Sequence, residues 1–170
     1  MKPNDHPARI LVAGIGNIFL GDDAFGVEVA TRLAAESLPD GVRLVDIGTR
    51  SLHLAYELLE TEYDLAILID AVARGGAPGT LYVIEPEPAG NGGNGVPVDA
   101  HGVRPEHALT MLRTLGGRVE SVRIVGCEPG RIGEEPGLSA PVAAAVPEAI
   151  RIVLRLVEEH SRHSDPARAG

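Results

Sequence analysis

The sequence predicts an α/β protein built on a mostly parallel sheet with helices on both faces. From residue 10 to residue 72, short apolar runs alternate with segments of helical periodicity, and parallel neighbouring strands need such crossover segments. The pattern then breaks, because only the segment VARGGAPG precedes the fourth apolar run. This link is too short for a crossover helix, so the fourth strand is expected to run antiparallel to the others.

The elements of the first half follow from apolar runs and their boundaries. Residues 10–14, ILVAG, lie between a charge and a glycine, as in a strand buried on both faces. A helix should follow the acidic pair and stop at Pro39. Strand 42–48 and helix 51–60 come next, the helix with four residues facing inward: Leu52, Ala55, Leu58 and Leu59. The run 64–72 is the most apolar of the chain and should be the central strand.

The second half begins with a strand at 80–86 and a segment, 86–98, that is rich in Pro, Gly and Asn. This segment should be a mobile loop, and a loop of this length in so small a domain is often functional. A helix should begin at Pro105, because proline suits the first helical position. After the strand SVRIVGCEP, the last helix should take Ser139 as its N-cap and be split or kinked by Pro147. The tail from residue 161 should fray.

Length, charge and composition limit the function. The 170 residues suit a single domain, 1–170. The net charge of −9 and the scarcity of aromatic residues argue against nucleic acid as a partner. No apolar run is long enough to span a bilayer, so no membrane role is expected. One cysteine cannot form an internal disulfide, and the first residues lack a signal-peptide pattern, which together predict a cytoplasmic protein.

The segment GIGNIFLGDDAFG, residues 14–26, resembles a nucleotide-binding loop only superficially. A dinucleotide fingerprint needs a third glycine where this chain has Phe19, whose bulk would stand at the helix–strand contact. Asp22 and Asp23 would also repel a pyrophosphate at the helix N-terminus. The lysine and hydroxyl residue of a P-loop are absent. A nucleotide enzyme therefore remains only a minor alternative.

The acidic residues offer a better hypothesis. Asp22 is assigned to helix capping, which needs no further chemistry. Asp23 follows the first strand and Asp70 ends the third, so both should lie at the carboxyl ends of neighbouring strands, where ligands of such sheets bind. Asp70 could instead cap a turn. His101, in DAHG, could supply a third ligand, and two carboxylates with one imidazole suit a divalent first-row metal.

The remaining histidines and the cysteine receive structural interpretations. Four histidines should be ordinary solvated side chains: His53, His107, His160 and His163. Cys127 should be a small buried residue and not a nucleophile.

Five segments of the chain together resemble the hydrogenase maturation proteases. They are GIGNIFLGDDAFGVEVA, VDIGTRSLHLAYEL, LAILIDAVARGGAPGTLYVI, DAHGVRPEHALTML and VRIVGCEPGRIGEEPGLSAPV. The resemblance covers residues 10–156, the expected core of the domain. It implies a three-layer α/β/α sandwich around a five-stranded mixed sheet, which agrees with an antiparallel fourth strand.

The resemblance also implies a function. Such proteases are endopeptidases that remove the C-terminal extension of the large-subunit precursor of nickel-iron hydrogenases. The family's nickel-recognition residues correspond here to Asp23, Asp70 and His101, and the nickel is supplied by the precursor, with no permanently bound organic cofactor. No separate nucleophile is evident, so these three residues are also the catalytic candidates, through the metal. The alternative is a nickel-sensing binding protein or chaperone that does not cleave.

Two departures from the family pattern qualify the resemblance. Many members carry Gly-Gly-Thr-x-Gly after the second strand, whereas DIGTRS has Ile47 and Ser51 in place of the first and last glycines. With Arg50, these changes suggest a different hydrogenase partner. The second departure is Ala24, where many members have glycine, and little effect is expected because a helical first turn accepts alanine readily.

Overall fold

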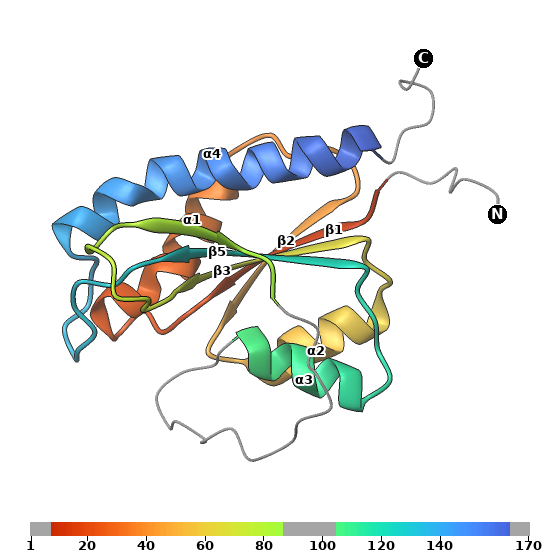
Figure 1. Cartoon of the computed structure of the whole chain (residues 1–170), viewed down its shortest axis with the longest axis horizontal. Helices are drawn as coiled ribbons and strands as arrows, with labels where there is room; N and C mark the ends of the chain where they lie inside the picture. The colour runs from red at the N-terminus through yellow and green to blue at the C-terminus, as the bar shows by residue number, and fades with distance from the viewer. Residues whose placement is uncertain (1–7, 87–104, 164–170) are drawn as a thin grey trace.

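The computed structural model describes residues 8–86 and 105–163 and has the predicted three-layer α/β/α architecture (Figure 1). The five strands are β1 (Ile10–Ile15), β2 (Val42–Gly48), β3 (Leu65–Ala71), β4 (Leu81–Ile84) and β5 (Ser121–Cys127). The helices are the 3-10 turn η1 (Gly21–Ala24), α1 (Phe25–Leu33), α2 (Ser51–Glu60), α3 (Pro105–Thr114) and α4 (Ala140–His163).

The strand order is β2-β1-β3-β5-β4, so the most apolar strand, β3, is central as predicted. β1, β2, β3 and β5 are parallel, and β4 pairs antiparallel with β5. The short link between β3 and β4 therefore has the consequence expected from its length.

Alternate residues of the strands pack on opposite faces of the sheet, which creates two cores. On one face, Ile10 and Val12 pack with buried residues of α1 and α4. On the other face, Leu11 and Ala13 pack with buried residues of α2 and α3. In Figure 1, α4 accordingly runs along one side of the sheet while α2 and α3 lie together on the other.

Three details of the helices differ from the sequence predictions. The helix after the acidic pair ends at Leu33, well before Pro39. In α2, Ala55 and Leu58 are buried and Leu59 is partly buried as predicted, but Leu52 is 48% exposed and Leu54 takes its place in the core. α4 is not split: Pro147 lies inside one continuous helix. Proline has no backbone N–H, so the carbonyl one turn earlier in the helix loses its usual donor. Because Pro147 is on the exposed face, that carbonyl can bind water.

The ends of the chain and the long loop are described only in part. α4 continues to His163, so fraying does not begin at residue 161. The mobile loop predicted at 86–98 lies outside the described residues from residue 87 onward. In the described part of the chain, no helix is both long and apolar enough to cross a lipid bilayer.

Close contact between α1 and the sheet is made by two glycines, Gly14 on β1 and Gly26 on α1, and only the first is a position of the dinucleotide fingerprint. A Cβ atom at Gly26 would lie 2.0 Å from the carbonyl oxygen of Ile69 and 2.3 Å from that of Ile15. Phe19 is 69% exposed and does not stand between helix and strand, so the steric objection to a nucleotide was misplaced. The first turn of α1 therefore lies directly on the ends of β1 and β3.

We expect Gly26→Ala to destabilise the protein strongly. The new methyl group would collide with backbone atoms, which cannot rotate away, and the helix would have to move off the sheet. Overpacking of this kind costs about 3 kcal/mol, measurable by chemical denaturation. Gly133→Ala is the matched control, because a Cβ there meets nothing within 4 Å. Equal stability of the two variants would show that α1 can shift without cost.

Candidate functional site

The candidate site lies at the edge of the sheet where the four parallel strands end. The segments that leave this edge are 16–24 after β1, 49–50 after β2, 72–80 after β3 and 128–139 after β5. Polar groups at such an edge commonly belong to ligand sites in open α/β sheets. The sequence-predicted residues Asp23 and Asp70 both belong to this edge.

Asp23 is carried by the tight turn that follows β1. Gly16 has φ +141°, and a Cβ there would lie only 1.8 Å from the carbonyl oxygen of Asp23. The chain thus folds back so that Asp23 lies over the end of β1, in a way that requires glycine. One carboxylate oxygen of Asp23 accepts a hydrogen bond of 2.9 Å from the backbone N–H of Asn17. Burial raises the pKa of Asp23, and this hydrogen bond offsets the rise only in part.

Asp70 is the penultimate residue of β3 and is 6% exposed. Its Oδ1 accepts a hydrogen bond of 2.8 Å from the backbone N–H of Ala71. This bond is made within β3, to the residue that directly follows Asp70, whereas a turn cap would bind the N–H of the residue after that.

The two aspartates belong to neighbouring elements. β1 and β3 are paired up to Gly14 and Ile69, and η1, which contains Asp23, contacts β3. His101 lies outside the described residues. Within residues 8–86 and 105–163, no three His, Cys, Asp or Glu side chains are grouped so as to hold a metal ion.

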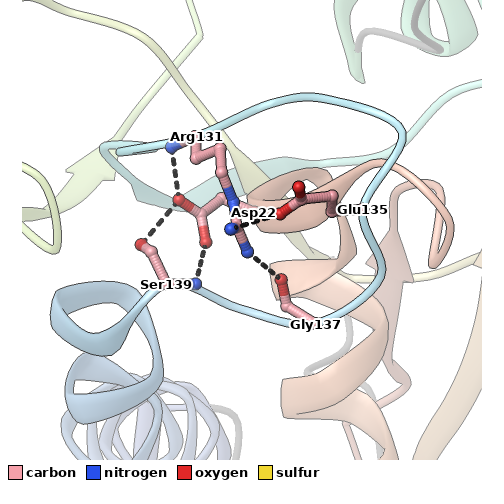
Figure 2. A network of polar contacts seen from close by, with 5 residues as sticks. All are labelled: Asp22, Arg131, Glu135, Gly137 and Ser139. Atoms are coloured by element: carbon pink, nitrogen blue, oxygen red, sulfur yellow. Dashed lines mark hydrogen bonds and ion pairs between the residues drawn. The ribbon is translucent and has the colours of Figure 1, made fainter.

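Asp22 does not have the helix-capping role that was predicted for it. It is fully buried, and it caps neither η1 nor α1 by a side-chain hydrogen bond. Instead, its carboxylate accepts hydrogen bonds from the backbone N–H groups of Gly130, Arg131 and Ser139 and from the Ser139 hydroxyl, at 2.6–2.8 Å. Figure 2 shows the carboxylate enclosed by this distant segment. The backbone N–H of Asp22 also donates to the carbonyl of Arg131 at 2.8 Å.

These hydrogen bonds determine the ionisation of Asp22. Burial alone would raise its pKa, but the backbone and hydroxyl donors of Ser139 and the backbone donors of Arg131 and Gly130 together outweigh burial and lower it. The carboxylate is therefore ionised at neutral pH. The capping prediction was wrong because it considered only groups close in sequence, whereas these donors lie 108 to 117 residues away.

The segment bound to Asp22 is itself braced. The Arg131 guanidinium donates to the Glu135 carboxylate at 2.8 Å and to the carbonyl of Gly137 at 3.4 Å (Figure 2). Ser139 occupies the N-cap position of α4 as predicted, and its carbonyl accepts from the N–H of Ala143. Its hydroxyl, however, serves Asp22 and not the helix.

Glu128 is a third buried carboxylate at this edge, besides Asp22 and Asp70, and the sequence analysis assigned it no function. It follows β5 directly and is 6% exposed. Its oxygens accept hydrogen bonds from the backbone N–H of Arg74 (2.8 Å), that of Gly75 (3.2 Å) and the Tyr82 hydroxyl (2.8 Å). The Arg74 N–H, above all, lowers the pKa of Glu128 against the effect of burial. A carboxylate directly after a buried strand was the signal used for Asp70, and it could have found Glu128.

Cys127 and three of the four remaining histidines can be compared with their predictions. Cys127 is fully buried, and burial raises its pKa to about 11, so the thiol is protonated at neutral pH, as predicted for a structural residue. His53 and His163 are exposed as expected. His160 differs, because packing buries its Nε2 atom and lowers its pKa. The side chain of His107 is outside the described residues.

The sequence of this chain is similar to those of one family of known proteins. The sequence model of the family described as HycI, hydrogenase maturation protease, matches residues 27–156. The chain belongs to the hydrogenase maturation protease family. A putative hydrogenase maturation protease of Methanocaldococcus jannaschii is 34% identical over 161 residues, covering 91% of this chain and 97% of its own. The hydrogenase 2 maturation protease of Escherichia coli is 31% identical, covering 95% and 98%.

Solved structures of maturation proteases support the same fold for this protease. The hydrogenase maturating endopeptidase HybD of E. coli has a TM-score of 0.73 and 30% identity, covering 89% of this chain and 93% of its own. The hydrogenase 2 maturation peptidase of a Thaumarchaeota archaeon has a TM-score of 0.68 and 32% identity, covering 88% and 98%. The five-stranded mixed sheet predicted from the sequence resemblance is thus confirmed.

The segment DIGTRS, which differs from the family pattern, lies at the end of β2 and the start of α2. Ile47 is buried in the core beneath α2, so its replacement of a family glycine adds packing on that face. Arg50 is exposed in the turn between β2 and α2. Ala24 is buried within η1, and the turn accommodates it.

We expect Asp22→Asn to destabilise the protease by about 2–3 kcal/mol, because the new amide group must face at least one N–H donor that has lost its charged acceptor. Chemical denaturation measures the loss. Asp40→Asn is the control, since Asp40 is exposed at the opposite edge of the sheet and should change stability by less than about 0.5 kcal/mol. Equal values for both variants would contradict the assignment of Asp22 as an internal brace.

The same carboxylate predicts a pH dependence. Because folding lowers the pKa of Asp22 below its ordinary value of 3.8, its ionised form stabilises the folded state above that pH. This contribution is lost as the pH falls from 3.8 through the lower folded pKa. The stability difference between wild type and Asp22→Asn should therefore be constant near neutrality and shrink in acid. A difference that grows in acid would mean that the folded pKa is raised.

Proposed function

We propose that this protease removes the C-terminal extension from a nickel-loaded precursor of a nickel-iron hydrogenase large subunit, and that Asp23, Asp70 and His101 bind the nickel in that precursor. The observation that carries the proposal is that Asp23 and Asp70 belong to the ends of the neighbouring strands β1 and β3 in a member of this family. Nickel belongs to the substrate in this proposal and is not a resident cofactor.

The chemistry of the three side chains supports this use. Two carboxylates and an imidazole are hard to borderline ligands that suit Ni²⁺ without holding it permanently. Such a set leaves coordination positions for thiolates of the precursor, so that recognition is complete only when loaded substrate is present. Bound nickel would polarise a nearby carbonyl group or lower the pKa of a water molecule.

The ionisation of the Asp23 carboxyl group also suits the binding of a cation. Its half-buried carboxylate is less stabilised in the ionised form than that of Asp22: the Asn17 N–H offsets burial only in part, and the pKa of Asp23 is raised. A cation that replaces the missing stabilisation would favour the ionised form, as metal binding does generally.

Incubation of purified protease with the precursor, with and without nickel, followed by intact-mass measurement, tests the proposal. We expect loss of a C-terminal fragment only from the nickel-loaded precursor. Asp23→Asn and His101→Ala should each abolish trimming, because each removes one of three metal ligands. Asp40→Asn and His163→Ala are the matched controls, since both side chains are exposed and have no assigned part in the site.

Three results would contradict the proposal in different ways. An unchanged precursor mass despite full nickel loading would exclude cleavage. Complex formation without trimming would instead identify a nickel-sensing binding protein or chaperone. Stabilisation by a nucleotide, with no effect of nickel-loaded precursor, would favour an enzyme acting on nucleotides.

Arg50 is the residue we propose to influence the choice of precursor. It is exposed beside the start of α2, at the same edge of the sheet as Asp23 and Asp70. Replacing it by glycine should change the KM for the precursor more than kcat, because it acts on docking and not on nickel. An unchanged KM would remove Arg50 from the docking surface.

A further inference from the structure

The four residues from Glu128 to Arg131, here called the strut, connect the loop that follows β3 with the turn that follows β1, next to two of the proposed nickel ligands. On one side the strut is bound to the loop after β3. Besides the contacts of its carboxylate, the N–H of Glu128 donates to the carbonyl of Thr80 at 2.8 Å, and its carbonyl accepts from the N–H of Gly79 at 2.9 Å. This loop begins two residues after Asp70.

On its other side the strut is bound to the turn after β1. Gly130 and Arg131 donate their N–H groups to the Asp22 carboxylate, and the carbonyl of Arg131 accepts from the N–H of Asp22. Asp22 immediately precedes Asp23. The strut therefore reaches from the loop after one proposed ligand to the residue before the other.

Gly130 is the glycine of the strut, and there is little space beside it for a side chain. A Cβ there would lie 3.1 Å from Cβ of Pro78, 3.2 Å from Oγ of Ser139 and 3.4 Å from Oδ2 of Asp22. The absent side chain thus allows the two loops to approach on either side of the backbone. Gly130 has none of the positive φ values that would disfavour other residues, so its role here is spatial.

We propose that the strut is a positioning element that sets the separation of Asp23 and Asp70, with Gly130 as the spacer. The inference rests on the proposed function, because it assigns the strut to the geometry of the nickel-reading pair. Buried carboxylates at both of its ends make the connection rigid, since a displaced Asp22 or Glu128 would leave charge without donors. Glu128 and Gly130 touch no reacting atom and act through the two aspartates.

The size of the expected effect follows from the sensitivity of catalysis to position. Misplacement of a catalytic group by 1 Å can cost about a hundredfold in rate, and the contacts at Gly130 require a shift of a few tenths of an ångström, so about a tenfold loss is expected. The overall fold should change little, because Gly130→Ala removes no hydrogen bond.

The experiment compares Gly130→Ala with Gly133→Ala on nickel-loaded and nickel-free precursor. Gly133 lies in the same segment but has open space around it, so its variant is the matched control. We expect Gly130→Ala to lower kcat about tenfold, in line with the sensitivity above, to leave the KM for the precursor unchanged, and to reduce the preference for the nickel-loaded form. Gly133→Ala should match wild type in all three.

A second pair of variants tests the other end of the strut. Glu128→Gln keeps an oxygen acceptor for the backbone of the 72–80 loop, whereas Glu128→Ala removes it. The glutamine variant should retain more of kcat and of the nickel preference than the alanine variant. Each rate is measured well below the melting temperature of the variant, so that loss of folded protein is not counted as loss of catalysis.

The outcomes separate this inference from the proposed function. If wild type trims the loaded precursor and Gly130→Ala trims it equally fast, the strut has no positioning role and the proposed function stands. If kcat of Gly130→Ala falls only in proportion to the folded fraction, the strut is merely structural and the inference is overturned. If wild type trims nothing, the proposed function fails, and the inference fails with it.

Discussion

A carboxylate without water is tolerable in a folded protein only when donors surround it, and Asp22 receives its donors from a segment more than a hundred residues away. This requirement connects the turn after β1 to the start of α4, across the edge where four strands end. The positions of η1, of the 128–139 segment and of the first turn of α4 all depend on it. The sheet supports these segments from below, and the buried charge of Asp22 holds them together above its edge.

The acidic residues at this edge divide by their surroundings. Asp22 and Glu128 each have three or more donors, and their pKa values are lowered despite burial. Asp23 has the N–H of Asn17, and its pKa is raised by burial. The charge of the first kind of carboxylate is already stabilised by hydrogen bonds within the protein, whereas the second kind would gain stabilisation from a bound cation. Adjacent residues of identical type therefore differ in what they can do.

Much of the architecture could be predicted because it rests on local patterns. Apolar runs located the strands, and the short link before β4 predicted its direction. The placement of Asp70 followed from its position at the end of an apolar strand. The part played by Asp22 could not be predicted, because a local cap and a distant brace look alike in sequence. The solvent-facing position of Pro147 and the inward turn of Leu54 depend on tertiary packing, which no local pattern contains.

The hydrogen bonds of Arg131 to Glu135 and Gly137 join two parts of the 130–139 segment and restrain it in the free protein. A surface loop of this kind would ordinarily lose conformational freedom when a large protein binds, at a cost of about 0.5–1.5 kcal/mol for each side chain immobilised. Here much of that ordering belongs to the folding of the free protein. A partner that docked on the segment would therefore have to immobilise its exposed side chains, such as Ile132, but would have less of the loop backbone to order.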